Sequence, residues 1–266
     1  MATVRRRLAR RQPSADDSVT SPATATEAIA RAVHDAIARG EGRVLGSGYQ
    51  AIVELYSTPA GPVVVKKAHG SGPFGALYRH LLRREHAVYE QLAGVPGVPR
   101  TYGLVDDEHL ALEYIAGPSL RTHERELKDR AGFFAALLET LHAMHAAGVA
   151  HADLKRKANI IVGPGERPWL IDFGIAARRG TSALGRAWFA HQVQGDYNAW
   201  IKLKYGRRIE PAEAADALSP EDAALYRPLW SEKIARAIRV PWQIITLRRP
   251  RQRWRARRHG SDEDTR

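Results

Sequence analysis

A polar stretch near the middle of the chain carries side chains whose types and spacing suit a group-transfer reaction. Asp153 could accept the proton of an attacking hydroxyl, and Lys155 could neutralise a phosphoryl group in transit. The amide oxygen of Asn159 could bind a divalent cation, and Asp172, which begins an Asp-Phe-Gly triplet, adds a carboxylate that could clamp the same ion. Each piece alone fits an ordinary polar loop about equally well, so the interpretation depends on the remaining motifs.

Two lysines upstream could hold phosphate groups. Lys66 and Lys67 follow the apolar run 63–65, and a lysine on the inner face of a strand could reach the α and β phosphates of a nucleotide. Glu85, on the helix expected next, could hold that ammonium group in place. Side chains alternate along a strand, so only one lysine can point inward; we take Lys66, with Lys67 as its rival. The plain alternative is two solvated lysines and a surface glutamate.

A pair of glycines, Gly46 and Gly48, stands on either side of Ser47 between two strand-like runs. Glycines at such a turn let backbone N–H groups approach phosphates closely, because a Cβ would collide with them. A short Gly-X-Gly by itself indicates a simple hairpin turn more often than a phosphate loop. The order of all the motifs must therefore decide the interpretation.

The elements that would position these residues follow from the spacing of apolar side chains. In the first half we expect helix 26–39, strands within 43–56 and 61–68, helix 76–93 with Leu77, Leu81, Val88 and Leu92 inward, and strands near 101–105 and 110–115. In the second half we expect helix 131–147, a hairpin of strands 159–163 and 169–173, and helices near 188–204, 211–217 and 220–239. The first half is therefore rich in strands and the second mainly helical.

Composition favours an ordinary enzyme and excludes several kinds of site. The chain has 266 residues, 44% hydrophobic and 26% charged, and it has no cysteine, which excludes disulfides, thiolate zinc sites and cysteine nucleophiles. No apolar run is long enough to span a membrane, so we expect a cytoplasmic location. The net charge of +12 comes from the two ends, since residues 1–12 hold five arginines, residues 246–258 hold seven, and neither segment holds an acid. This charge therefore does not indicate a nucleic-acid-binding core.

Six motifs in order resemble the protein-kinase-like fold over residues 43–177. They are LGSGYQAIV for the glycine-rich loop, VVVK for the lysine strand, Glu85 for the αC glutamate, LEYIAG for the hinge, HADLKRKAN for the catalytic loop and LIDFG for the metal-binding triplet. The resemblance implies an α+β, bilobal fold with an antiparallel-sheet N-lobe, one αC helix and a shortened, mainly helical C-lobe. The segments expected are a disordered Arg-rich arm (1–24), a helix and N-lobe (25–115), a C-lobe (116–245) and an Arg-rich tail (246–266).

The same resemblance implies an active kinase that uses ATP and Mg²⁺, with ATP in the cleft between the lobes. The catalytic residues would be Asp153, Lys155, Lys66 and Glu85, and the metal ligands would be Asn159 and Asp172. The nucleotide would contact Leu45, Gly46, Ser47, Gly48, Tyr49, Val53, Val64, Lys66, Glu113, Ile115, Ile161 and Ile171. Glu113 and Ile115 would do so through backbone groups.

Departures from the protein-kinase pattern bear on the acceptor. Ala51 stands at the third loop glycine, Ala152 replaces the arginine that pairs with an activation-loop phosphate, and Asn159 comes one residue late. No Ala-Pro-Glu follows Asp172 at the expected distance, so the peptide-docking part is expected to be truncated or rebuilt.

Two longer strings bear on the same question. They resemble bacterial lipopolysaccharide kinases and related small Ser/Thr kinase-like proteins, and they read LLRREHAVYEQLAGVPGVPRTYG and GVAHADLKRKANIIV. Lipopolysaccharide kinases phosphorylate core sugars such as heptose or 3-deoxy-manno-octulosonic acid. The preferred acceptor is therefore a lipopolysaccharide core sugar. A protein serine or threonine is the alternative, and an inactive kinase-like scaffold is the third interpretation.

Basic residues suggest where the acceptor or a membrane could bind. A cluster that suits an acidic acceptor, or that simply faces the phosphates, consists of Lys155, Arg156, Lys157, Arg178 and Arg179. The C-terminal stretch joins the seven arginines to apolar anchors, namely Trp242, Ile244, Ile245, Leu247 and Trp254. It could hold the protein at the inner face of the cytoplasmic membrane, or it could be a packed helix followed by a solvated tail. Nucleic acid is the least favoured partner.

Overall fold

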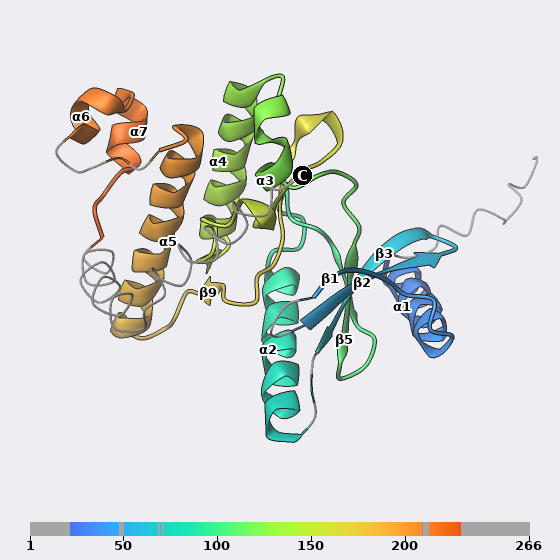
Figure 1. The fold of residues 1–266 in the computed structure, drawn as a ribbon. Coiled ribbons are helices and arrows are strands. Elements are labelled where there is room, and N and C mark those ends of the chain that lie inside the picture. The colour runs from blue at the N-terminus through green and yellow to red at the C-terminus, as the bar shows by residue number, and fades with distance from the viewer. Residues whose placement is uncertain are drawn as a thin grey trace, which may run out of the picture. The chain divides into compact units, whose positions relative to one another are not determined.

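The computed structural model describes residues 22–47, 51–68, 70, 72–207, 209 and 213–229, and these divide into two units. The first unit holds the described residues up to Arg79 together with Thr101–Tyr114, and the second holds His80–Arg100 and the described residues from Ile115 onward. Figure 1 shows the elements of both units. No helix among the described residues is long and apolar enough to cross a membrane.

The first unit is built on an antiparallel sheet of five strands. In spatial order these are β1 (Arg43–Ser47), β2 (Ala51–Thr58), β3 (Gly61–Ala68), β5 (His109–Glu113) and β4 (Thr101–Leu104). The turn between β2 and β3 ends at Gly61, whose φ of 112° is a conformation that glycine adopts without a steric cost. The strands expected over 43–68 are thereby confirmed.

Helix α1 (Pro22–Ala38) covers one face of this sheet (Figure 1). Val33 and Ala36 of the helix are buried in one apolar cluster with Tyr56 of β2 and with Val63 and Val65 of β3. Burying an aliphatic side chain of this size stabilises a fold by about 1.5–3 kcal/mol. The expected helix is confirmed, and its apolar period packs it onto alternate residues of the central strands.

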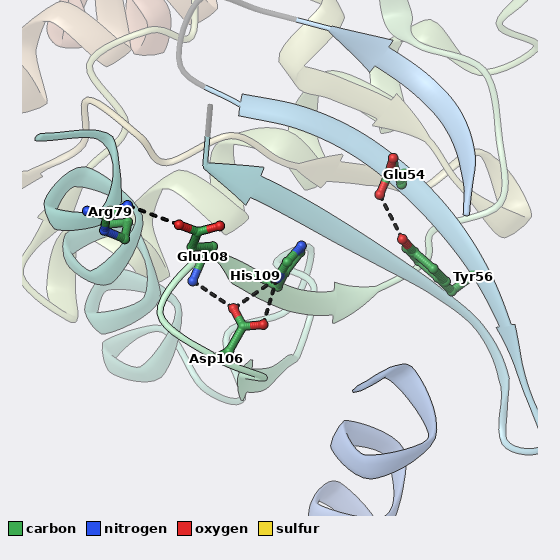
Figure 2. Close-up of polar contacts among 6 residues, drawn as sticks. All are labelled: Glu54, Tyr56, Arg79, Asp106, Glu108 and His109. Atoms are coloured by element: carbon green, nitrogen blue, oxygen red, sulfur yellow. Dashed lines mark hydrogen bonds and ion pairs between the residues drawn. The ribbon is translucent and has the colours of Figure 1, made fainter. Parts of the chain in front are cut away.

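Tyr56 has a polar end within this apolar face. Its hydroxyl donates a hydrogen bond to the carboxylate of Glu54 at 2.8 Å (Figure 2). Burial, together with this hydrogen bond, raises the pKa of Tyr56 to about 12. The hydroxyl therefore remains a hydrogen-bond donor at any physiological pH.

The turn between β4 and β5 fixes the ends of two neighbouring elements (Figure 2). The carboxylate of Asp106 accepts a hydrogen bond from the N–H of Glu108 at 2.7 Å and lies 2.8 Å from Nδ1 of His109. The side chain of Glu108 forms an ion pair with Arg79 of helix α2 (Gly72–Gln91) at 3.0 Å. Its carbonyl oxygen accepts a hydrogen bond from Ala68, the last residue of β3, at 2.8 Å. The turn thus holds the end of the strand that carries the two lysines.

The second unit is mainly helical. Helix α4 (Arg130–Ala146) buries Phe134, Leu137, Leu141 and Met144, as the apolar period predicts. Helix α5 (Ala183–Lys204) packs against α4, and the indole N–H of Trp200 donates to the carbonyl oxygen of Phe134 at 2.8 Å. The shorter helices and turns are α3 (Leu120–His123), η1 (Glu124–Glu126), η2 (Lys157–Asn159), η3 (Pro164–Glu166), α6 (Ala214–Ala217) and α7 (Pro220–Leu225).

Two small ladders complete the second unit. Strand β6 (Val149–Ala150) pairs with β9 (Ala177–Arg178), and β7 (Ile160–Val162) pairs with β8 (Pro168–Leu170). The expected hairpin is confirmed, although β8 ends before Ile171 and Asp172. The α+β class, with an antiparallel first sheet and a helical second part, is likewise confirmed.

Three expected helices differ from those observed. Helix α5 begins at Ala183, earlier than the expected 188, and α7 ends at Leu225. Residues 226–229 of the helix expected over 220–239 are not helical, and the rest of that helix lies outside the described residues. The expected inward face of α2 is partly wrong, because Leu77 is exposed.

The buried side chains of α2 show why its face was misassigned. They are Leu82, Glu85, Val88 and Tyr89, which recur with helical spacing, and Leu92 is buried just after the helix. A carboxylate occupies one position of this buried stripe. A pattern based on apolar residues alone therefore places the buried face of the helix too close to Leu77. The polar exception is itself one of the candidate catalytic residues.

Candidate active site

Asp153 and Asn159 lie in the loop between β6 and β7 and contact each other. Nδ2 of Asn159 donates to the carboxylate and to the carbonyl oxygen of Asp153, both at 3.2 Å. Asn159 is buried, whereas Asp153 is partly exposed. The pairing directs the amide nitrogen toward Asp153 and leaves the amide oxygen to serve as a cation ligand.

A buried carboxylate on α5 holds the backbone just before Asp153. Asp196, only 1% exposed, accepts hydrogen bonds from the N–H groups of His151 at 2.7 Å and Ala152 at 3.0 Å. Nε2 of His145 lies 3.1 Å from the same carboxylate. Ala152 has a φ of 65°, a conformation that costs a residue with a Cβ about 1–3 kcal/mol. Asp196 therefore stabilises a strained loop next to the candidate base.

The sequence analysis did not identify Asp196. Its only signal is that it is the sole acidic residue between Asp172 and Glu210. No short motif links it to the loop, because the contact is long-range and depends on how α5 packs. Tyr89 and His145 were missed for the same reason.

Residues of α2 hold the backbone around Asp172. The N–H of Asp172 donates to the hydroxyl of Tyr89 at 3.3 Å, and the N–H of Phe173 donates to the carboxylate of Glu85 at 3.2 Å. The ring of Phe173 meets Tyr89 edge to face, with centroids 5.1 Å apart, and lies 4.9 Å from the ring of His151. Asp172 has a φ of 68°, so it too is a strained residue at the site. The pairing of Glu85 with Lys66 stays a prediction.

One hydrogen bond ties Asn159 to the residue just before Asp172. The N–H of Ile171 donates to the carbonyl oxygen of Asn159 at 2.9 Å, so Asn159 is bonded to the residue next to Asp172. The carbonyl oxygen of Ile171 lies 3.1 Å from Nε2 of His151. An amide oxygen and a carboxylate are hard oxygen donors, the type that Mg²⁺ prefers. The donor chemistry of this pair therefore fits Mg²⁺.

The sheet register of the first unit separates the two lysines. Lys67 lies on the same face of β3 as Val65, which packs against α1. Lys66 lies on the opposite face with Val64, and its cross-strand partner is Val53. The three side chains expected to contact the nucleotide from this part of the sheet thus share one face. The geometry favours Lys66 over Lys67.

The remaining expected nucleotide contacts of the first unit are in β1 and β5. Leu45 is exposed. The pairing of β1 with β2 shifts register between Val44 and Gly46, and Gly46 is the cross-strand partner of Val53. Ser47 ends β1, and Glu113 ends β5. Gly48 and Tyr49 lie outside the described residues.

The apolar contacts expected from the second unit lie near the β7–β8 hairpin. Ile161 is in β7 and Ile171 follows β8, both half-buried. The preceding chain packs on the hairpin, because the N–H of Val162 donates to the carbonyl oxygen of Pro118 at 2.8 Å. Ile115 approaches Gly163 of the same hairpin. Ile115 therefore lies beside the hairpin that contains Ile161.

Intramolecular contacts engage much of the expected basic cluster. Arg178 donates to the amide oxygen of Gln91 at 2.6 Å, and Arg179 donates to the carbonyl oxygen of His145 at 3.2 Å. Lys157 forms an ion pair with Glu124 of η1. These three side chains thus help to hold the fold, which weakens the expectation of an anion-binding cluster.

Two basic residues of the loop remain exposed beside the candidate base. Nε of Arg156 lies 3.4 Å from the carboxylate of Asp153, and Lys155 is also exposed. A cation here can offset negative charge near Asp153. The position of Lys155 relative to a phosphoryl group stays a prediction.

Glu124 is held by two cations. Arg130 lies 3.1 Å from its carboxylate, opposite Lys157. Burial alone would raise the pKa of Glu124, but the hydrogen bonds from Lys157 and Arg130 outweigh it and lower the pKa below the ordinary 4.5. This ion-pair cluster joins η1 to the end of the catalytic loop.

Comparisons with known proteins agree with one another. A family model described as a protein kinase domain matches residues 40–195. A protein of Thermomonospora curvata that carries the name of a serine/threonine-protein kinase, PkwA, is 32% identical over 148 residues, covering 53% of this chain and 20% of that protein. A protein of Oryza sativa subsp. japonica that carries the name of a cyclin-dependent kinase, F-2, is 40% identical over 150 residues, covering 50% of this chain and 45% of that protein. The chain thus spans less than half the length of these relatives.

Proposed function

This chain belongs to the protein kinase family, and we propose that it transfers the γ-phosphate of ATP to a hydroxyl group. The observation that carries the proposal is the contact of Asn159 with Asp153, together with the backbone bond that ties Asn159 to the residue before Asp172. A candidate base and two oxygen ligands for a cation are thereby joined in one small network. Such a constellation is what an in-line transfer to a hydroxyl requires.

Each residue has a distinct part in the proposed reaction. Asp153 accepts the proton of the attacking hydroxyl, and Lys155 offsets the charge of the group in transit. Asn159 and Asp172 would hold Mg²⁺, which would neutralise negative charge on the phosphates when bound.

The nucleotide contacts are proposed residue by residue from the sequence motifs that carry them. Lys66 would orient the phosphates, and Glu85 is the carboxylate that the motifs pair with it. The residues assigned to the rest of ATP are Leu45, Gly46, Ser47, Gly48, Tyr49, Val53, Val64, Glu113, Ile115, Ile161 and Ile171. The shared face of Lys66, Val64 and Val53 supports this assignment.

A serine or threonine of a protein is the acceptor that the relatives favour. One relative carries the name of a serine/threonine-protein kinase, and the other that of a cyclin-dependent kinase. Nothing in these comparisons supports a lipopolysaccharide kinase. We therefore place the protein acceptor first.

A lipopolysaccharide core sugar is the second candidate, favoured by one observation. Helix α5 begins at Ala183, so only residues 173–182 separate Asp172 from the next long helix. This connection leaves little chain for a peptide-docking segment. A small acceptor would not need such a segment.

A labelling experiment separates the two acceptors. The full chain is incubated with Mg²⁺ and ATP labelled at the γ position, once with a mixture of serine- and threonine-containing peptides and once with lipopolysaccharide lacking core phosphate. We expect label on peptide hydroxyls and none on the sugar. Label on the sugar alone would assign the second acceptor, and label on neither would leave only the scaffold interpretation.

A further inference from the structure

Arg156 lies beside the candidate base on the exposed side of the catalytic loop. Its Nε is 3.4 Å from Oδ2 of Asp153, and its side chain is 70% exposed. Nδ2 of Asn159 donates to the same oxygen at 3.2 Å. In the part of the chain that the structure describes, both recorded contacts of this carboxylate therefore go to Oδ2. Oδ1 is then the oxygen that can take the proton of the acceptor hydroxyl.

The backbone keeps Arg156 at this position. Its N–H donates to the carbonyl oxygen of Asp153 at 3.2 Å, and its carbonyl oxygen accepts a hydrogen bond from the N–H of Asn159 at 2.9 Å. Arg156 is thus bonded on one side to the candidate base and on the other to a candidate metal ligand. The guanidinium group therefore extends from a fixed point next to the reacting groups.

Arg156 differs from the other cations nearby in the partner that it contacts. Lys157 pairs with Glu124, which also contacts Arg130 at 3.1 Å, so these charges offset one another inside the fold. The recorded carboxylate partner of Arg156 is Asp153 itself. Asp153 loses its negative charge when it accepts the proton of the hydroxyl, whose oxygen bonds to the γ-phosphorus as the bond to ADP breaks. A negative group on the acceptor would then offset the charge of Arg156.

We propose that Arg156 selects serines and threonines that have an acidic side chain one or two residues away, an inference that rests on the proposed kinase reaction. A hydroxyl bonded to Oδ1 of Asp153 would lie within about 8 Å of Nε of Arg156. An extended peptide advances about 3.3–3.6 Å per residue, so the first or second neighbour can reach the guanidinium group. Arginine binds a carboxylate through two parallel N–H groups, and it repels a lysine at the same place. Lys155, also exposed, adds to that repulsion.

Three peptides test this preference. They share one serine in a neutral sequence and differ only in the two residues on each side of it, which are glutamate, glutamine or lysine. Initial rates are measured with the full chain, Mg²⁺ and ATP. We expect kcat/KM to be at least about fivefold higher for the glutamate peptide than for the lysine peptide, mainly through KM, because the charges act on peptide binding.

Substitutions of Arg156 should change the ratio of kcat/KM between peptides, in which any general loss of rate cancels. Arg156→Gln should bring the glutamate and glutamine peptides within about twofold of each other, and Arg156→Glu should favour the lysine peptide. Arg156→Lys keeps the charge and should retain the parent order. The matched control is Arg167→Glu, which makes the same charge change at an exposed arginine of the turn between β7 and β8 and should also keep that order. A thermal melt of each variant shows whether the fold is retained.

The possible results separate this inference from the kinase reaction itself. Equal kcat/KM for the three peptides with the parent chain would overturn the inference and leave the kinase reaction intact. An unchanged order in Arg156→Glu, or an equal change in Arg167→Glu, would show that Arg156 is not the source of the preference.

Absence of transfer to every peptide would contradict the proposed function, and peptide binding would then decide the inference. Fluorescent copies of the peptides, with alanine in place of the serine, are titrated with the full chain. The glutamate copy should bind the parent more tightly than the lysine copy, and Arg156→Glu should reverse this order. Equal binding of the copies to the parent would overturn the inference.

Discussion

At the scale of single residues, Asp196 determines the shape of the loop that presents Asp153. Its carboxylate binds two backbone N–H groups and lies beside His145, all in a buried setting. This arrangement explains how Ala152, a residue with a Cβ, keeps a positive φ.

Asp196→Ala should lower both stability and turnover. Removing the carboxylate leaves buried donors without an acceptor, which costs about 2–4 kcal/mol. Urea unfolding should show this loss, and the rate of phosphate transfer should fall by at least about tenfold because the loop is no longer held. Asp216→Ala, at an exposed acid of α6, is the control. Normal turnover in Asp196→Ala would show that the loop does not need this anchor.

Glu124 should make stability depend on pH in the acid range. Its pKa is below the ordinary value because two cations hold the carboxylate, so its contribution is present above pH 4.5 and is lost as the pH falls through the lowered pKa. Glu124→Gln should therefore flatten the decline of the melting temperature over that acid range. Glu139→Gln, at an exposed acid of α4, should leave the decline unchanged. An unaltered slope in Glu124→Gln would contradict this account of the cluster.

At the scale of elements, the chain between β5 and α3 depends on Gly117. This residue has a φ of 152°, and a Cβ added there would collide with the carbonyl oxygen of Val162. The N–H of Val162 in turn donates to the carbonyl oxygen of Pro118. Residues 117–118 therefore lie directly against the hairpin that contains Ile161.

Gly117→Ala should destabilise the protein by about 2 kcal/mol or more and weaken ATP binding, because backbone must move to relieve the collision. Gly165→Ala is the matched control. Gly165 also has a positive φ, of 68°, but a Cβ there would meet nothing within 4 Å. That variant should lose only about 1 kcal/mol. Chemical unfolding and calorimetric titration with ATP measure both quantities, and equal losses in the two variants would refute the packing argument.

Local patterns in the sequence predicted most elements but not their long-range contacts. The alternation in β3 and the helical period of α4 predicted those elements, because each buries one regular face. The face of α2 was misjudged because Glu85, a carboxylate, occupies its buried stripe. Asp153, Asn159 and Asp172 were identifiable because they stand in short motifs. Asp196 and Tyr89 were not, because their role depends on which helices pack beside those motifs.

At the scale of the whole molecule, the net charge of +12 is unevenly distributed along the sequence. The excess arginines at 1–12 and 246–258 fall outside the described residues, while the described second unit adds its own acid-free segment at 173–195. The basic residues are therefore concentrated at the two ends and in the segment 173–195 of the sequence.

The most direct test of the proposed reaction compares the parent chain with Asp153→Asn. Both are assayed for transfer of labelled γ-phosphate to a peptide hydroxyl and for ATP binding by calorimetry in the presence of Mg²⁺. If Asp153 accepts the proton of the acceptor, transfer should fall by at least about 100-fold while the affinity for ATP stays nearly the same. Transfer at the parent rate in Asp153→Asn would contradict the assignment of the active site.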